Sequence, residues 1–156
     1  MQKLRIIVGA DHRGFELKDR LVAWLRSEGH EVEDIGTHST ESVDYPPYAF
    51  KVGEAVASGR CDRGILVCHS GNGIAMAANK VYGVRAAVCM NVEHAEMARR
   101  HNDANVLVIG QDYIQPGAEF EMVKTWLETP FDGGRHARRI AQIREYETRQ
   151  LSGKGS

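Results

Sequence analysis

The 156-residue sequence lacks the features that would tie a protein to a membrane, to nucleic acid or to an oxidising compartment. No apolar run approaches the roughly 18 residues that span a bilayer, and the amino terminus turns polar too early for a signal peptide. Twenty basic and 21 acidic residues leave a formal charge of −1, which favours neither DNA nor anionic lipid as a partner. Three cysteines, at 61, 68 and 89, cannot all pair with one another. We therefore expect a cytoplasmic protein without disulfides, whose partner is a small molecule.

What the sequence does contain is a regular alternation of apolar strands and helical patterns, within a length typical of one domain. Each connection is long enough for a crossover helix, so the strands should lie parallel. This predicts an α/β fold in three layers, with a five-stranded, Rossmann-like parallel sheet covered by helices on both faces. Ligands should bind at the carboxyl ends of the strands. The order of the strands in the sheet does not follow from a single sequence. The predicted strands are residues 3–9, 31–35, 65–67, 84–89 and 106–109.

The carboxyl-terminal part departs from this alternation. Residues 129–134 form a Pro- and Gly-containing hinge, and residues 135–151 form a polar helix whose apolar stripe is Ile140, Ile143 and Tyr146. A helix this charged favours packing on a second subunit, which would make the protein at least a dimer, with a tetramer also open. The predicted division is a single domain over residues 1–151 and a disordered tail over 152–156.

Cys68 ends the third predicted strand, immediately before a glycine-rich turn over residues 69–73 and a helix of small residues. The backbone N–H groups at the start of that helix should point toward the thiol and toward the hydroxyl of Ser70. A thiol that faces a helix amino terminus should have its pKa lowered from about 8.5, which suits a base or a nucleophile. The alternative is that Cys68 is an inert core residue, as most buried strand cysteines are.

Other motifs exclude some functions and suggest binding groups. The glycine-rich turn matches neither the nucleotide P-loop nor the dinucleotide pattern, and the histidines lack the paired spacing of a zinc site. No metal or cofactor is therefore expected. His101 stands at a helix-to-strand corner, and His12 follows the first strand. Arg135, Arg138 and Arg139 share a helix face that suits an anion, although a solvated basic face is the more common origin of such a pattern.

Six motifs resemble, in order and spacing, those of the type B ribose-5-phosphate isomerases over nearly the whole chain. The wider family also contains isomerases of galactose 6-phosphate, allose 6-phosphate and tetrulose 4-phosphates. The resemblance implies a metal-free aldose–ketose isomerase that acts through a cis-enediolate, in an obligate dimer with composite active sites. It favours interconversion of D-ribose 5-phosphate and D-ribulose 5-phosphate. The alternatives are another sugar or sugar phosphate, or a non-catalytic sugar-phosphate-binding module. The motifs are GADHRGFELK (9–18), DYPPYA (44–49), GILVCHSGNGIAMAANK (64–80), RAAVC (85–89), HNDANVLVIG (101–110) and TPFDGGRHARRI (129–140).

By the same resemblance, Cys68 is the general base that moves a proton between C1 and C2, and Ser70 shuttles a proton between the two substrate oxygens. His101 donates the proton that opens the furanose ring. The backbone of residues 69–73 holds the enediolate, which makes His69, Gly71, Asn72 and Gly73 substrate-binding residues. The other contacts implied are Asp11, Tyr45 and Asn102 to the sugar, and His12, Arg135 and Arg139 to the phosphate, with both arginines reaching across from a partner subunit.

Two positions depart from the family pattern. Asp112 stands where many members carry an arginine that grips the phosphate, and His69 replaces a glycine. An aspartate that faced a phosphate dianion would repel it. Ile74 occupies the position where members without the cysteine carry a glutamate, so the chain resembles the cysteine type. We expect that Asp112 turns away from the ligand or that the ligand is held differently, which leaves the preferred sugar open.

Overall fold

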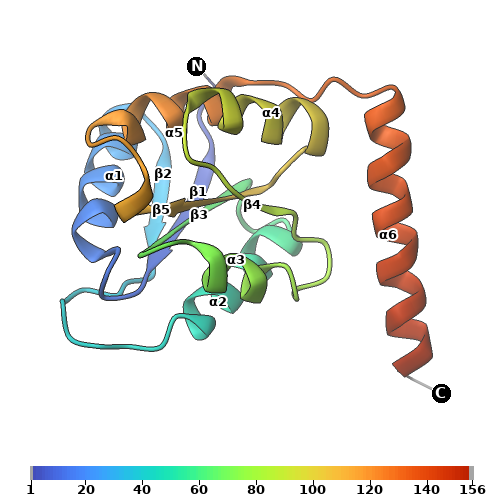
Figure 1. The fold of residues 1–156 in the computed structure, drawn as a ribbon, viewed down its shortest axis with the longest axis horizontal. Coiled ribbons are helices and arrows are strands. Elements are labelled where there is room, and N and C mark those ends of the chain that lie inside the picture. Colours follow the sequence, from blue (N-terminus) through green and yellow to red (C-terminus); the bar gives the residue numbers. More distant parts are fainter. Residues whose placement is uncertain (1, 155–156) are drawn as a thin grey trace.

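Five parallel strands form one sheet, in the order β2-β1-β3-β5-β4, in the computed structural model, which describes residues 2–154 (Figure 1). The central strands β3 and β5 are buried along almost their whole length, which explains their continuous apolar sequences. The predicted α/β class and five-stranded parallel sheet are confirmed. The strands are β1 (Arg5–Ala10), β2 (Glu31–Asp34), β3 (Arg63–Cys68), β4 (Ala86–Val88) and β5 (Val106–Gly110).

Helices cover both faces of the sheet, as the alternating sequence pattern predicts. One hydrophobic cluster joins α1, α4 and α5 to one face, and a second cluster joins α2 and α3 to the other. Because each helix is apolar along only one side, the sheet buries those sides and leaves the polar sides in water. The helices are α1 (Phe15–Ser27), α2 (Pro46–Ala57), α3 (Asn72–Ala78), α4 (Val92–Asn102) and α5 (Ala118–Glu128).

Two elements near the sheet differ from the sequence prediction. The fourth strand is shorter than the predicted 84–89. It begins only at Ala86, because the backbone N–H of Arg85 donates to the side chain of Asn105 rather than to a neighbouring strand. A short 3₁₀ helix, η1 (Gln111–Tyr113), follows β5 and was not predicted. Such single turns carry little periodic signal in a sequence.

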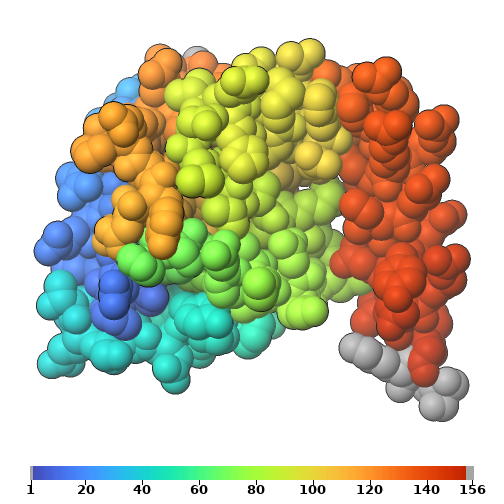
Figure 2. All heavy atoms as spheres, viewed as in Figure 1, coloured from blue at the N-terminus to red at the C-terminus, as the bar shows by residue number. Residues whose placement is uncertain are grey.

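Helix α6 (Arg135–Lys154) stands at one side of the sandwich, joined to α5 by an extended segment (Figure 1). Its own chain holds it near the far end, where Tyr82 contacts Thr148 and the N–H of Gly83 donates to Glu147. Ile140 is buried, but Ile143 and Tyr146 are 49% and 58% exposed, and α6 forms one whole edge of the molecule in Figure 2. Packing on a second subunit therefore stays a prediction.

The end of α6 also bears on the predicted tail. The helix continues through residues 152–154, into the stretch expected to be disordered, and residues 155–156 lie outside the described part of the chain. Among residues 2–154, no helix combines the length and the apolar character that a membrane crossing requires.

The loop between β2 and α2 is fixed against the end of β1. The N–H of Ala10 donates to the carbonyl of Gly36, and the N–H of Thr37 donates to the carbonyl of Ala10, both at 2.8 Å. Beneath this loop the fully buried ammonium of Lys18 lies 2.8 Å from the carboxylate of Asp34. A buried charge requires such a partner, so this ion pair anchors the loop that carries Tyr45.

Candidate active site

Cys68 and Asp11 lie next to each other at the carboxyl end of the sheet. In the parallel register Ala10 pairs with Val67, so the residues that follow them emerge side by side. The chain leaves β1 toward β2 on one side, while β3 lies on the other. This is the topological switch point at which doubly wound sheets bind ligands. The sequence prediction of a carboxyl-end site is consistent with this arrangement.

The thiol of Cys68 is buried, with only 7% of the residue exposed, and the N–H of Gly71 donates to its sulfur at 3.3 Å. Burial raises the pKa of Cys68 above its ordinary value, and the charge of Asp11 adds to that increase. Backbone N–H groups of Gly71, Ile74 and Ser70 act in the opposite direction but do not outweigh burial. The expectation of a lowered pKa was therefore wrong, because burial at the end of the strand outweighs the effect of the backbone N–H groups.

The turn after Cys68 is held in one conformation by close packing. Gly71 adopts φ +87°, in the left-handed region that favours glycine, and the N–H of Asn72 donates to the hydroxyl of Ser70 at 3.3 Å. Gly110 of β5 lies so close to this turn that a Cβ atom on it would collide with the carbonyl of Ser70. The backbone N–H groups of the turn are thus presented in a fixed geometry, as an anionic intermediate requires.

Tyr45 lies over the start of α3. A Cβ atom built on Gly73 would lie 2.6 Å from the hydroxyl oxygen of Tyr45, so the glycine is what allows the phenol to approach. Tyr45 is 37% exposed. The structure thus brings Tyr45, from the β2–α2 loop, to the turn that follows Cys68.

His12 is fixed in orientation by the same loop. Its Nδ1 accepts a hydrogen bond from the backbone N–H of Val43 at 3.1 Å, so the ring carries its proton on Nε2. An imidazole of this tautomer offers one N–H donor away from the loop. Its neighbour Asp11 uses Oδ1 to accept the N–H groups of Arg13 and Gly14, which shapes the turn into α1.

His69 does not point freely into solvent. Its Nδ1 is in hydrogen-bond contact with the carboxylate of Asp112, and its ring meets Tyr113 edge to face with centroids 5.7 Å apart. The guanidinium of Arg13 lies 3.5 Å from the same nitrogen. The two residues that depart from the family pattern are therefore in direct contact.

The remaining predicted residues lie at the opposite end of the sheet. His101 and Asn102 end α4, just before β5 begins, and Arg135 and Arg139 stand in the first turns of α6. Since a strand rises about 3.3 Å per residue, the four steps of β5 alone span about 13 Å between the two ends. Within one chain, these four residues do not reach Cys68.

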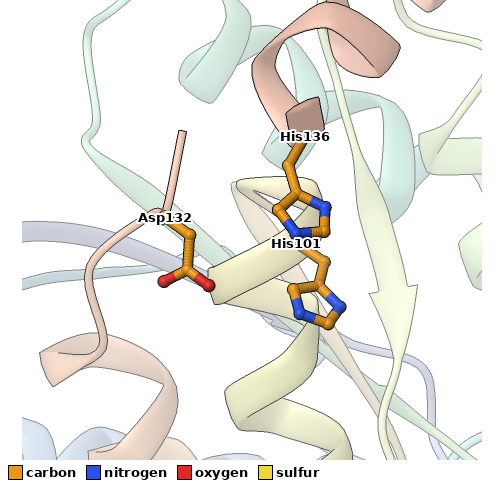
Figure 3. Close-up of side chains that lie close together, drawn as sticks. All are labelled: His101, Asp132 and His136. Carbon is orange, nitrogen blue, oxygen red and sulfur yellow. The ribbon is translucent and has the colours of Figure 1, made fainter. Parts of the chain in front are cut away.

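This second group includes a residue that the sequence interpretation missed. The ring of His136 stacks on that of His101, with centroids 4.2 Å apart and planes inclined by 8° (Figure 3). The only sequence signal was its place beside Arg135 in the GGRH segment. His101, His136, Arg135 and Arg139 thus form one unit at the junction of α4 and α6.

The other cysteines behave as core residues. Burial raises the pKa of Cys61, and it raises that of Cys89 to about 12. All three cysteines are free thiols, as expected.

Fold and site together define a class: a doubly wound α/β enzyme with a thiol, a carboxylate and a glycine-rich turn at the switch point of its sheet. The particular family is shown by comparison. Residues 6–143 match the Ribose/Galactose Isomerase family, and the chain belongs to it.

Individual relatives align over nearly their full lengths. The chain is 45% identical to ribose-5-phosphate isomerase B of Escherichia coli, over 94% of this chain and 98% of the relative. A ribose-5-phosphate isomerase B structure from Clostridium thermocellum superposes with a TM-score of 0.91 at 50% identity, covering 94% of this chain and 99% of that one. The Mycoplasma genitalium enzyme with bound ribulose-5-phosphate gives a TM-score of 0.89 at 38% identity, covering 92% and 96%. The chain is therefore a sugar-phosphate isomerase.

Proposed function

We propose that this chain interconverts D-ribose 5-phosphate and D-ribulose 5-phosphate, with Cys68 as the general base. The observation that carries the proposal is the Cys68 turn, where a buried thiol faces backbone N–H donors at the switch point of the sheet. The names of the full-length relatives and the ribulose-5-phosphate bound to one of them support this substrate pair.

The reaction moves a proton between C2 and C1 of the open-chain sugar. The thiolate of Cys68 removes the proton from C2, which leaves a cis-enediolate, and the thiol then returns the proton to C1. Ser70 moves a proton between the two oxygens of the enediolate. The backbone N–H groups of the loop over residues 69–73 stabilise its negative charge, and losing one such donor typically costs about 3 to 4 kcal/mol in the barrier.

Each site is completed by a second copy of the chain. This part of the proposal is supported by the separation of Cys68 from His101, Arg135 and Arg139, which lie at opposite ends of one sheet. The exposed apolar side chains of α6, at Ile143 and Tyr146, offer the surface for a homodimer. In the dimer, His101 of one copy opens the furanose ring of a sugar whose reacting carbons lie at Cys68 of the other.

The phosphate of the substrate is bound far from the reacting carbons. His12 offers its Nε2–H as a donor, since Nδ1 is occupied by Val43, and Arg135 and Arg139 of the second copy contribute charged donors. Asp11, Tyr45 and Asn102 contact the sugar hydroxyls between the two ends. Binding energy from the phosphate thereby aligns C1 and C2 at Cys68.

The cytoplasm is the compartment that suits this chemistry. Cys68 acts only as a free thiol, and a reducing compartment keeps it so.

The test is a direct assay of the purified chain with a panel of phosphorylated and unphosphorylated pentoses, hexoses and tetroses. Ribose 5-phosphate should give the highest kcat/KM. Cys68→Ala should abolish turnover while the protein still binds the substrate, whereas Cys89→Ala, which removes another buried thiol, should remain active. Conversion of a different sugar phosphate with none of ribose 5-phosphate would refute the substrate. Binding without turnover in the unmodified chain would indicate a non-catalytic module.

A further inference from the structure

The pair His101 and His136 joins two segments that are distant in the sequence. His101 is the penultimate residue of α4, and His136 is the second residue of α6. Their rings lie nearly parallel, one above the other, and both side chains are partly buried (Figure 3). One face of the His101 ring is therefore covered by His136.

The backbone around His136 is fixed to the end of α4. The carboxylate of Asp132 contacts the Nε of Arg100 at 3.2 Å, and the N–H of Asp132 donates to the carbonyl of Arg100 at 3.0 Å. The N–H of His136 then donates to the carbonyl of Gly133, which closes the turn into α6. His136 is thus held in place by contacts that do not depend on its own ring.

A metal site is the first alternative, because nitrogens of both histidines and a carboxylate oxygen of Asp132 lie within 4.8 Å of one another. The stacked geometry of the two rings argues against a metal site. A histidine nitrogen binds an ion along its lone pair, which lies in the plane of the ring. An ion held by both rings would therefore have to lie in both ring planes, but these planes are inclined by only 8° and do not meet between the rings. The carboxylate of Asp132 is also already engaged by Arg100. The arrangement suits stacking, not chelation.

We propose that His136 is a positioning residue, which holds the His101 imidazole so that its edge meets the ring oxygen of the sugar. This rests on the proposed function, in which His101 opens the furanose ring. Ring opening breaks the bond between C1 and the ring oxygen. The ring oxygen takes a proton from His101, and the C1 hydroxyl releases its own to solvent, which forms the aldehyde. Because His136 covers one face of the His101 ring, that ring cannot turn away from the sugar, whereas the nitrogens at its edge stay free.

The charges around His136 are compatible with this role. Burial lowers the pKa of His136, and the neighbouring charges of His101, Arg135 and Arg139 lower it further, against an opposing effect of Asp132. The lowered pKa of His136 keeps a second positive charge out of the stack, so its ring can lie against the ring of His101 without repulsion.

The test separates ring opening from proton transfer. Ribulose 5-phosphate has no closed furanose form, because its phosphate occupies the oxygen that would close the ring. Deuterium exchange at its C1 in D₂O, measured by NMR, therefore requires Cys68 but no ring opening. General acid catalysis is worth roughly 10²- to 10⁴-fold. His136→Ala should therefore lower kcat for ribose 5-phosphate by about 10- to 100-fold and leave the C1 exchange rate nearly unchanged.

Two further variants complete the design. His136→Phe keeps a stacked ring without nitrogens and should restore most of the ribose 5-phosphate activity. Lys124→Ala, at an exposed position of α5, should match the unmodified enzyme, and circular dichroism should show all variants folded. A higher KM in both assays, or a Phe variant as impaired as the Ala variant, would mean that His136 contacts the substrate directly and would overturn the inference. If the unmodified chain does not convert ribose 5-phosphate, the proposed function fails, and the inference fails with it.

Discussion

The imidazole of His69 and the carboxylate of Asp112 are in direct polar contact between the loops that follow β3 and β5, immediately beside Cys68. The backbone N–H of Asp112 also donates to the carbonyl of His69 at 3.3 Å, so the two loops are joined by both side chain and main chain. The carboxylate that would repel a phosphosugar is thereby directed at an imidazole, with the guanidinium of Arg13 nearby. The two departures from the family pattern compensate each other.

Removing His69 should expose the charge of Asp112. We expect His69→Gly to raise the KM for ribose 5-phosphate about 2- to 5-fold at low salt, the size of a Coulomb effect over several ångströms near a surface. The increase should disappear at high salt, where exposed charges are screened. The double variant His69→Gly/Asp112→Asn should restore the KM, and Glu121→Gln, on the exposed side of α5, serves as the control. A KM change that is independent of salt would contradict this explanation.

The raised pKa of Cys68 predicts how activity depends on pH. A base acts in its deprotonated form, so kcat/KM should increase as the pH rises through the alkaline range toward the pKa of the thiol. Because the charge of Asp11 contributes to the raised pKa, Asp11→Asn should move thiol ionisation to lower pH. The rate of Cys68 alkylation by iodoacetamide, taken as the difference from Cys68→Ala, measures this directly. An unchanged midpoint would show that Asp11 does not act on the thiol.

Two glycines of the site should respond differently to alanine. At Gly73 the atoms nearest to the added methyl belong to the partly exposed side chain of Tyr45, so Gly73→Ala should raise KM with little loss of stability. At Gly110 the methyl meets the carbonyl of Ser70, and the backbone of the turn must shift. Gly110→Ala should therefore cost about 3 kcal/mol of unfolding free energy and most of the turnover. Urea unfolding and steady-state kinetics on both variants measure the contrast, which equal stability losses would contradict.

The sheet and the residues at its carboxyl end were predictable because both are local in the sequence. Continuous apolar residues mark β3 and β5, and Asp11 and Cys68 stand directly at strand ends. What the sequence did not indicate depends on contacts between distant segments. Lysine side chains are usually exposed, but Lys18 is buried against Asp34. His136 contacts His101 only because α6 lies near the end of α4. No periodicity encodes such contacts.

His30 predicts a loss of stability in acid. The residue is buried, its Nδ1 accepts the N–H of Leu4 at 3.1 Å, and burial lowers its pKa below the ordinary value of about 6.5. Well above pH 6.5 it is neutral in both the folded and unfolded states. As the pH falls below 6.5, the unfolded chain takes up the proton first, so unfolding becomes more favourable. Urea unfolding at pH 7.5 and 5.5 should show this decrease, and His30→Asn, which keeps an acceptor, should reduce it. An equal decrease in the variant would exclude His30 as the cause.

Composite sites predict that two inactive variants restore activity when they are mixed. Both sites of a Cys68→Ala homodimer lack the thiol, and both sites of a His101→Ala homodimer lack the imidazole. Each variant alone should therefore be inactive. After denaturation and refolding as a mixture, half of the dimers combine both chains, and each has one site with an intact Cys68 and an intact His101. Statistical mixing should therefore recover about a quarter of wild-type activity. A mixture of His101→Ala with Arg139→Ala should recover none, since both changes affect the same end of the chain. If the first mixture also stays inactive while light scattering shows that mixed dimers have formed, then Cys68 and His101 do not act together across the interface.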